Sequence, residues 1–292
     1  MFEIKNKIIL AEDIKRLDVY APDIAAKSLP GQFVSICPEE GDERIPLTVI
    51  DSDFNKGMIS IIFRECGSTT KKLGKFSIGE KVSSILGPLG LPARIESKGL
   101  IVCIATDMGT AQILPICRAH RKAGCKVIGI IGAKTKRQLL LEAQMRLSCD
   151  KLHVRTEDGS YVKRGVATDV LKSILQEKKV DLVYVIGSIE FMQSVVSISK
   201  KQKIKTRVQL KPVMVDCMGM CGACRVKVGG EMVLACCDGP EFDGHKVDFD
   251  DFSLRQKAFE EAGTCQNSKS PFSRKNGGAG ILTKLFSDII EK

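Results

Sequence analysis

Short apolar segments separated by turn residues dominate the first third of the chain. Residues 31–37 (GQFVSIC), 45–51 (IPLTVID) and 57–63 (GMISIIF) are rich in β-branched residues, and glycine, proline and aspartate stand between them. Short strands at such regular spacing are typical of a small antiparallel barrel. The pattern predicts an antiparallel β-barrel over residues 1–97.

The pattern changes near residue 98, where apolar strands begin to alternate with amphipathic helices. Residues 99–105 (GLIVCIA) and 126–133 (KVIGIIGA) are apolar throughout, and a helical pattern follows each of them. Strands that are apolar on both faces indicate a parallel sheet covered by helices on both sides. We therefore expect an α/β parallel-sheet domain over residues 98–210.

The remaining residues predict a small module and a tail. Residues 211–254 are rich in cysteine and poor in helix patterns, so a metal is a plausible staple for a module this small. Residues 255–292 are expected to form a linker and a terminal amphipathic helix, which docks on a partner or packs on its own chain. Its apolar face would comprise Ile281, Leu282, Leu285, Phe286, Ile289 and Ile290.

Composition points to a cytoplasmic protein. No apolar run approaches the roughly 20 residues that span a bilayer, and the apolar stretch at the N-terminus is too short for a signal peptide. In a reducing compartment the 12 cysteines are free thiols or metal ligands. Four of them lie scattered in the α/β segment and are expected to be small buried apolar residues: Cys103, Cys117, Cys125 and Cys149.

Positive charge is concentrated in the middle of the chain. Residues 98–210 contain 21 Lys and Arg against 9 Asp and Glu, whereas the segments on either side are close to neutral. Such a surplus suits a phosphate-bearing cofactor or an acidic protein partner. We expect no nucleic-acid partner, because the chain has no zinc finger, aromatic RNA-binding motif or basic-region helix.

A cysteine cluster within residues 215–230 (VDCMGMCGACRVKVGG) is the most specific chemical signal. Cys221 and Cys224 are separated by two residues, and Cys236 follows after eleven more. This spacing suits a metal held by a tight loop and a following hairpin.

Zinc and an iron–sulfur cluster are the two candidates for this metal. Zinc would require a second closely spaced pair, and the side chains of the adjacent Cys236 and Cys237 would diverge in a strand. Gly219 and Gly222 favour the iron–sulfur cluster, because they let backbone N–H groups approach the sulfides. A zinc-stapled binding module without redox activity remains the alternative from a different class.

The order of the segments resembles that of the ferredoxin-reductase-like electron-transfer subunits. A strand-rich segment with RIPLT (44–48), an α/β segment and the cysteine cluster are followed by CDGPEFDGHKVDFDDF (237–252). The family includes the small subunit of NADH-dependent ferredoxin:NADP oxidoreductase, also known as sulfide dehydrogenase beta subunit, and the dihydroorotate dehydrogenase electron-transfer subunit. The resemblance, over residues 1–254, implies an FAD-binding barrel, an NAD(P)-binding-like α/β domain and a [2Fe-2S] module.

The resemblance also implies the ligands of the cluster. In the dihydroorotate relatives the ligands follow Cys-x4-Cys-x2-Cys with a fourth cysteine further on, and the first place here holds an aspartate, as in the ferredoxin:NADP oxidoreductase subunits. The implied ligands are Asp216, Cys221, Cys224 and Cys236. Cys217, where glycine would be usual, is the alternative to Asp216, and Cys237 is expected to be a bystander.

RIPLT resembles the flavin-binding signature on a barrel strand of this superfamily. The resemblance implies that Arg44 lies near the FAD pyrophosphate and Thr48 near the isoalloxazine N5, with Pro46 and Leu47 between them. Arg44 is one residue farther from the hydroxyl than in the relatives. Without the resemblance, the segment would be an edge strand that carries a proline.

Residues 61–70 (IIFRECGSTT) resemble the second flavin segment of the family. The residues implied to line the cofactor are Ile62, Phe63 and Arg64. The residues implied to donate hydrogen bonds to its phosphates, at the start of a helix, are Gly67, Thr69 and Thr70.

The nucleotide loop departs from the family pattern. At 105–112 (ATDMGTAQ), Gly109 and Thr110 fit a dinucleotide-binding turn, but Thr106 and Asp107 stand where glycines are expected. A carboxylate there would repel phosphate, and a side chain would block its close approach. Lys134, in a later segment, can meet a phosphate.

Two functions follow from this departure. In the first, the chain is an oxidoreductase subunit that binds NAD(H) and passes electrons through FAD and the [2Fe-2S] cluster to a partner. In the second, the nucleotide site has decayed, and the chain relays electrons between the cofactors of other subunits. Both imply a larger flavin and iron–sulfur subunit as partner, and ferredoxin is a further candidate. His120, His153 and His245 are expected to be structural or surface residues.

Overall fold

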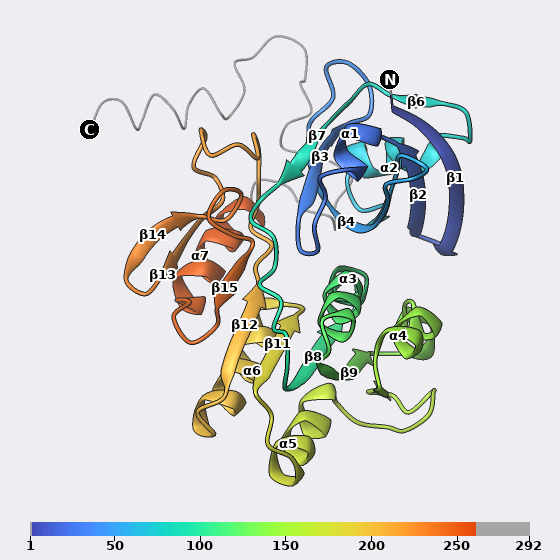
Figure 1. The fold of residues 1–292 in the computed structure, drawn as a ribbon. Coiled ribbons are helices and arrows are strands. Elements are labelled where there is room, and N and C mark those ends of the chain that lie inside the picture. Colours follow the sequence, from blue (N-terminus) through green and yellow to red (C-terminus); the bar gives the residue numbers. More distant parts are fainter. Residues whose placement is uncertain (1, 261–292) are drawn as a thin grey trace.

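The structure, a computed structural model, describes residues 2–260, which form a barrel, an α/β domain and a small hairpin module (Figure 1). This arrangement confirms the predicted fold class. The boundary predicted at 254/255 falls within helix α7 (Phe249–Glu260). The rest of the predicted linker and the predicted terminal helix lie outside the described residues.

The N-terminal sheet is antiparallel throughout, in the order β6-β1-β2-β5-β4-β3-β7. Its strands are β1 (Phe2–Ala11), β2 (Ile14–Tyr20), β3 (Phe33–Cys37), β4 (Ile45–Asp53), β5 (Met58–Arg64), β6 (Lys81–Val82) and β7 (Ser84–Leu89). Because the two end strands follow each other directly in sequence, the sheet nearly closes into a barrel around an apolar core. Two short helices, α1 (Pro22–Ala25) and α2 (Ser68–Lys75), complete the domain.

The second sheet has the order β10-β9-β8-β11-β12-β15 and is parallel except for its last strand. Its strands are β8 (Leu100–Thr106), β9 (Lys126–Ala133), β10 (Lys151–Thr156), β11 (Leu182–Ile186), β12 (Lys205–Gln209) and β15 (Glu241–Asp243). One face packs against α5 (Ala167–Glu177) and α6 (Ile189–Lys201). The other face packs against α3 (Gly109–Lys122) and α4 (Glu142–Ser148), and a 3₁₀ turn, η1 (Lys136–Gln138), precedes α4.

The C-terminal module joins both larger domains. Its hairpin consists of β13 (Arg225–Val228) and β14 (Glu231–Leu234), and its third strand, β15, pairs with β12 of the α/β sheet. On the barrel side, the Leu91 N–H donates to the Gly239 carbonyl at 2.6 Å. The module therefore contacts both the barrel side and the α/β domain.

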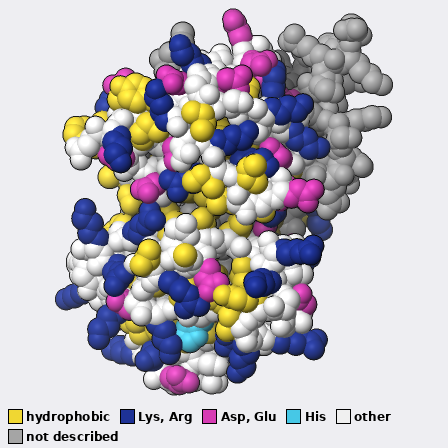
Figure 2. Space-filling view, turned by 90° about the vertical axis from the view of Figure 1, so that its right-hand side faces the viewer, with side chains coloured by type: hydrophobic (Ala, Val, Ile, Leu, Met, Phe, Trp, Pro, Cys, Tyr) yellow, Lys and Arg dark blue, Asp and Glu magenta, His cyan; other side chains and the backbone are white. Residues whose placement is uncertain are grey.

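The basic surplus of the middle segment lies on the surface of the α/β domain. Lys and Arg outnumber the acidic side chains over the lower half of the face in Figure 2, which this domain forms. Within residues 2–260, no helix is long and apolar enough to cross a membrane.

A buried histidine couples the stability of the α/β domain to pH. His120 on α3 is fully buried, and its Nδ1 accepts a hydrogen bond from the Glu96 N–H at 3.2 Å. Burial, reinforced by the charge of Arg207, lowers the pKa of His120 to about 4. The unfolded chain takes up this proton near pH 6.5, so stability from the neutral imidazole is present above pH 6.5 and lost as the pH falls toward 4.

We expect the free energy of unfolding to fall by about 2 kcal/mol between pH 7 and pH 5 because of this group alone, at about 1.4 kcal/mol per pH unit below 6.5. His120→Asn keeps an acceptor for the Glu96 N–H without a titrating ring. Denaturant unfolding at both pH values should therefore show a smaller loss in the variant. An equal loss in the two proteins would contradict the assignment.

Candidate functional site

The loop that precedes β13 folds around the carboxylate of Asp216. This carboxylate accepts hydrogen bonds from the N–H groups of Met220 at 2.7 Å and Cys221 at 2.8 Å, and a third from Met218 at 3.1 Å. The Cys221 sulfur lies 3.3 Å from the same carboxylate. Partial burial would raise the pKa of Asp216, but the three N–H donors outweigh burial and lower it. Asp216 is therefore a charged oxygen donor beside a thiol.

Cys224 and Cys236 form a second pair of donors. Both side chains are buried, and their thiols interact. Burial and then the neighbouring Cys224 thiol raise the pKa of Cys236. The four predicted ligands thus lie as two pairs, Asp216 with Cys221 and Cys224 with Cys236. Within residues 2–260, no group of three or more His, Cys, Asp or Glu side chains is arranged to hold one metal ion.

Cys217 is buried in the same hydrophobic core as Cys224 and Cys236. Its backbone is left-handed, with φ of 64°, and its side chain is 1% exposed. Burial raises the pKa of Cys217 to about 11. Cys237, in contrast, is exposed, with its sulfur 3.6 Å from that of Cys236. The Asp216 carboxylate lies against Cys221, and Cys217 is buried with Cys224 and Cys236, so the choice between Asp216 and Cys217 as first ligand stays a prediction.

The RIPLT segment (44–48) leads into β4, which lies between β5 and β3 in the barrel sheet. Pro46 pairs with Ser35 of β3, and both Pro46 and Leu47 are half-buried. The Thr48 hydroxyl is buried and lies 3.3 Å from Nε2 of Gln112 on α3. Arg44 precedes the strand, and its guanidinium donates to the Ser84 hydroxyl at 2.8 Å.

The second predicted flavin segment spans the end of β5 and the start of α2. Phe63 lies in the barrel core, and Ile62 packs with residues that line the contact to α3. Thr69 is buried. The Thr70 hydroxyl caps α2, because it accepts hydrogen bonds from the N–H groups of Cys66 and Gly67 at 3.0 and 2.9 Å. The segment thus stands at a helix start, where the Gly67 N–H and the Thr70 hydroxyl are used in the cap itself, and its role as a phosphate site stays a prediction.

Arg64 joins the barrel to the nucleotide loop. Its two terminal nitrogens donate to the Asp107 carboxylate at 2.9 and 2.7 Å, and its Nε lies 3.0 Å from Asp13. The hydrogen bond with Asp107 raises the pKa of Arg64. Burial alone would raise the pKa of Asp107, but the guanidinium lowers it. The charge of Asp107 is therefore balanced by Arg64, which reduces the repulsion of phosphate expected from the sequence.

A cavity of about 730 Å³ lies beside this ion pair, between the barrel and the carboxyl ends of the parallel strands. Ligands of open α/β sheets bind at this edge. Lys134 lines the cavity, whereas Gly109 packs against the backbone of Ile186 and Thr110 is buried in the start of α3. The cavity walls carry both charge signs: Asp13, Arg64, Asp107, Lys134, Arg137, Glu157 and Lys211.

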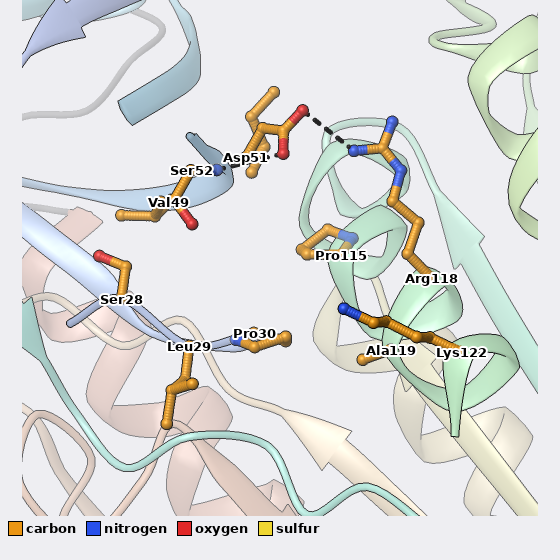
Figure 3. A pocket seen from close by; sticks show the side chains of 11 residues that line it. Ser28, Leu29, Pro30, Val49, Asp51, Ser52, Pro115, Arg118, Ala119 and Lys122 are labelled. Carbon is orange, nitrogen blue, oxygen red and sulfur yellow. Dashed lines mark hydrogen bonds and ion pairs between the residues drawn. The ribbon is translucent and has the colours of Figure 1, made fainter. Parts of the chain in front are cut away.

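A smaller cavity of about 210 Å³ separates β4 from α3 (Figure 3). Asp51 and Arg118 face each other across it, with 3.2 Å between Oδ2 and Nη1. Because none of the predicted site residues lines this cavity, the larger cavity and the cysteine loop constitute the candidate site.

Comparison with known proteins agrees with this geometry. The model of the iron–sulfur cluster binding domain of dihydroorotate dehydrogenase B matches residues 211–248. A Thermotoga maritima protein named dihydroorotate dehydrogenase B (NAD(+)), electron transfer subunit homolog is 36% identical over 89% of this chain and 92% of its own. A Clostridium beijerinckii protein described as an uncharacterized protein in adh 3′ region is 38% identical over 96% of this chain and 98% of its own.

The chain belongs to the family of dihydroorotate dehydrogenase B electron transfer subunits. A solved structure of the NADH-dependent reduced ferredoxin-NADP oxidoreductase contains a chain that matches it with a TM-score of 0.85 and 31% identity, over 100% of this chain and 98% of that one. The predicted resemblance is confirmed. This electron transfer subunit has a ferredoxin-reductase-like fold with an iron–sulfur-binding domain.

The donor set of the subunit fits a two-iron cluster. Such a cluster takes two protein ligands at each iron, so two separate pairs of donors suit it, whereas one zinc ion would need four donors around a single point. The backbone N–H groups of Met218, Met220 and Cys221, which donate to Asp216, belong to the same loop.

Two residues that the sequence did not single out contact predicted site residues. Gln112 contacts Thr48, and Asp13 contacts Arg64. Each contact joins segments far apart in the chain, so no spacing rule in the sequence could have predicted it.

Proposed function

We propose that the chain takes electrons from NAD(H), passes them through FAD to a [2Fe-2S] cluster, and delivers them to its larger partner subunit. FAD, when bound, accepts two electrons as hydride and releases them singly, which the one-electron cluster requires. The observation that carries the proposal is the convergence of three features: the flavin strand, the cavity at the sheet edge and the cysteine loop packed against the barrel.

Asp216, Cys221, Cys224 and Cys236 are the proposed cluster ligands. Their two pairs support this assignment, as does the position of the Asp216 carboxylate 3.3 Å from the Cys221 sulfur. A carboxylate is a harder ligand than a thiolate and would tune the cluster potential. The N–H donors to Asp216 hold its carboxylate in place.

The proposed flavin site uses the two barrel segments. Arg44 and Thr48 would act at the pyrophosphate and at the isoalloxazine, with Pro46 and Leu47 forming the strand between them. The start of α2 would bind phosphate through the segment that contains Gly67, Thr69 and Thr70. The wall beside it would comprise Ile62, Phe63 and Arg64, with Phe63 contributing backbone because its ring lies in the barrel core.

The proposed nucleotide site is the cavity of about 730 Å³. Lys134 would meet a phosphate, and Gly109 and Thr110 would set the turn into α3. The balance of the Asp107 charge by Arg64 supports binding of a phosphate-bearing cofactor there.

The free state of all 11 cysteines in residues 2–260 supports a reducing compartment such as the cytoplasm.

Neutralising Asp107 is expected to strengthen nucleotide binding. Asp107→Asn removes one negative charge from the cavity wall and releases Arg64, so NADH should bind about three- to tenfold more tightly, or roughly 0.7–1.4 kcal/mol. Titration of the FAD-loaded protein with NADH measures the dissociation constant. Asp51→Asn, which breaks the ion pair with Arg118 at the smaller cavity, is the matched control and should leave it unchanged. Weaker binding by Asp107→Asn would contradict the proposed site.

The relay function is the second candidate, favoured by Thr106 and Asp107 in the nucleotide loop. It retains the flavin, the cluster and the partner but takes electrons from another subunit, and ferredoxin remains a candidate donor or acceptor. Iron, sulfide and flavin analysis of the purified protein tests what both functions share. We expect two irons, two sulfides and one FAD per chain; zinc without iron would contradict both.

A further inference from the structure

Arg207 on β12 is a buried cation where the three modules meet. Its side chain is 8% exposed, and its guanidinium donates to the Arg94 carbonyl and, at 2.6 Å, to the Glu96 carboxylate. Its Nε lies 3.6 Å from the carboxylate of Glu241 on β15, whose side chain is also 8% exposed. One guanidinium thus contacts both β15 of the cluster module and the linker, residues 90–99, that joins the barrel to the α/β domain.

The linker lies along the segment that leads from the cluster loop into β15 (Figure 1). The Leu91 N–H donates to the Gly239 carbonyl at 2.6 Å, and the Arg94 N–H donates to the Glu241 carboxylate at 3.2 Å. This segment begins directly after Cys236, one of the proposed cluster ligands. A shift of the linker would therefore be transmitted to the chain that carries this ligand.

The barrel is fastened to the same place. The Ala93 N–H of the linker donates to the Pro30 carbonyl of the barrel at 2.8 Å. Gln209, two residues after Arg207 on β12, is 3% exposed, and its Nε2 donates to the Gly31 carbonyl at 3.4 Å. These barrel residues lead directly into β3, which pairs with the proposed flavin strand β4. Barrel, linker, β12 and β15 thus form one junction around Arg207.

The guanidinium gives this junction a defined geometry. Its donors form a rigid planar fork, so the acceptors on the linker and on β15 are held at fixed positions relative to β12. A buried ion pair adds little stability compared with well-packed apolar side chains of similar size. The geometry that the ionic junction fixes therefore explains it better than stability alone.

We propose that Arg207 is a positioning residue for electron transfer, whose guanidinium fastens the linker and β15 to β12 and so holds the flavin-binding barrel and the cluster at a fixed separation. This inference rests on the proposed function. In the step concerned, one electron leaves the reduced flavin and the same electron reduces the cluster. Without the guanidinium, the linker would open more often, and the average separation would increase.

Trypsin cleavage after Arg94 reports on the junction independently of activity. Arg94 is exposed, but the carbonyl of the peptide bond that trypsin would cut accepts the hydrogen bond from Arg207. Cleavage there requires the linker to open locally. Mass spectrometry follows the fragment that begins at Ile95. Flash photoreduction of the flavin gives the rate of flavin-to-cluster electron transfer in the same loaded protein, and thermal unfolding and the EPR spectrum of the reduced cluster are recorded beside it.

Three variants separate positioning from stability. Arg207→Met combined with Glu241→Gln removes both charges with little change of volume, so the fold should be kept while the guanidinium contacts are lost. Arg207→Lys keeps the charge but not the planar fork. Arg255→Met is the matched control, because it breaks an ion pair of 2.8 Å with Asp251 that lies within helix α7.

In the double variant we expect cleavage after Arg94 to be about tenfold faster and electron transfer about tenfold slower, since small misplacements of reacting groups have large kinetic costs. The EPR spectrum of the cluster should stay unchanged, because Arg207 is not a ligand. Arg207→Lys should lie between the native protein and the double variant in both rates. Arg255→Met should resemble the native protein.

A native transfer rate in the double variant would overturn the inference, whether or not cleavage after Arg94 becomes faster. So would slower transfer that accompanies a lower unfolding temperature and cleavage throughout the chain, because that would indicate a structural role alone. Failure of the native protein to take up iron and flavin would instead refute the proposed function, so the two failures are distinguishable.

Discussion

Alanine at Cys224 is expected to abolish binding of the iron–sulfur cluster. Cys224 is buried, interacts with Cys236 and lies in the core of the C-terminal module. Loss of its thiolate would leave one iron with a single protein ligand from the proposed set. The module should also lose stability, because a domain this small depends on its metal.

Iron analysis and the visible absorption of the reconstituted protein measure this effect. Cys237→Ala removes the adjacent exposed thiol and should bind a full cluster. Asp216→Ala and Cys217→Ser then separate the two candidates for the fourth ligand. Asp216→Ala should lose the cluster or change its spectrum, and Cys217→Ser should not; the reverse result would refute the assignment.

Alanine at Gly109 is expected to destabilise the α/β domain and displace the start of α3. A Cβ atom at this position would lie 2.5 Å from the Ile186 carbonyl oxygen and 2.9 Å from its carbon. Both atoms belong to the backbone of the central strand β11, which cannot move aside. We expect the free energy of unfolding to fall by about 2–3 kcal/mol and the unfolding temperature by roughly 5–10 °C.

Gly67→Ala is the matched control for this change. Gly67 directly precedes α2, as Gly109 begins α3, but its backbone is extended, and the nearest atom to an added Cβ is 4.0 Å away. The free energy of unfolding of the Gly67→Ala variant should change by only about a few tenths of a kcal/mol. If Gly109→Ala were as stable as the native protein, that result would contradict the close approach of α3 to β11.

Much of the fold could be predicted because its signals are local. The apolar alternation of β3, β4 and β5 predicted the barrel, and the continuous apolar runs of β8, β9 and β11 predicted the parallel sheet. The three residues of β15 gave no such signal, since a strand this short has no period to detect. Its addition to β12 depends on the tertiary contact between the module and the sheet.

The candidate site was predictable in its residues but not in their directions. Spacing grouped Cys221, Cys224 and Cys236, and the family resemblance added Asp216, with Cys217 as the alternative. The choice between Asp216 and Cys217 depends on how the loop directs the two side chains, which spacing does not encode. Nor could the sequence predict the balance of Asp107 by Arg64, since the two residues are 43 positions apart.

An anaerobic titration with NADH tests the proposed electron path most directly. The purified subunit, loaded with FAD and cluster, is titrated while flavin absorbance and the EPR signal of the reduced cluster are recorded together. We expect NADH to bleach the flavin and to produce the cluster signal in the same sample. If dithionite produces both changes but NADH produces neither, electrons do not enter this chain from NADH, and the relay function would replace the one proposed.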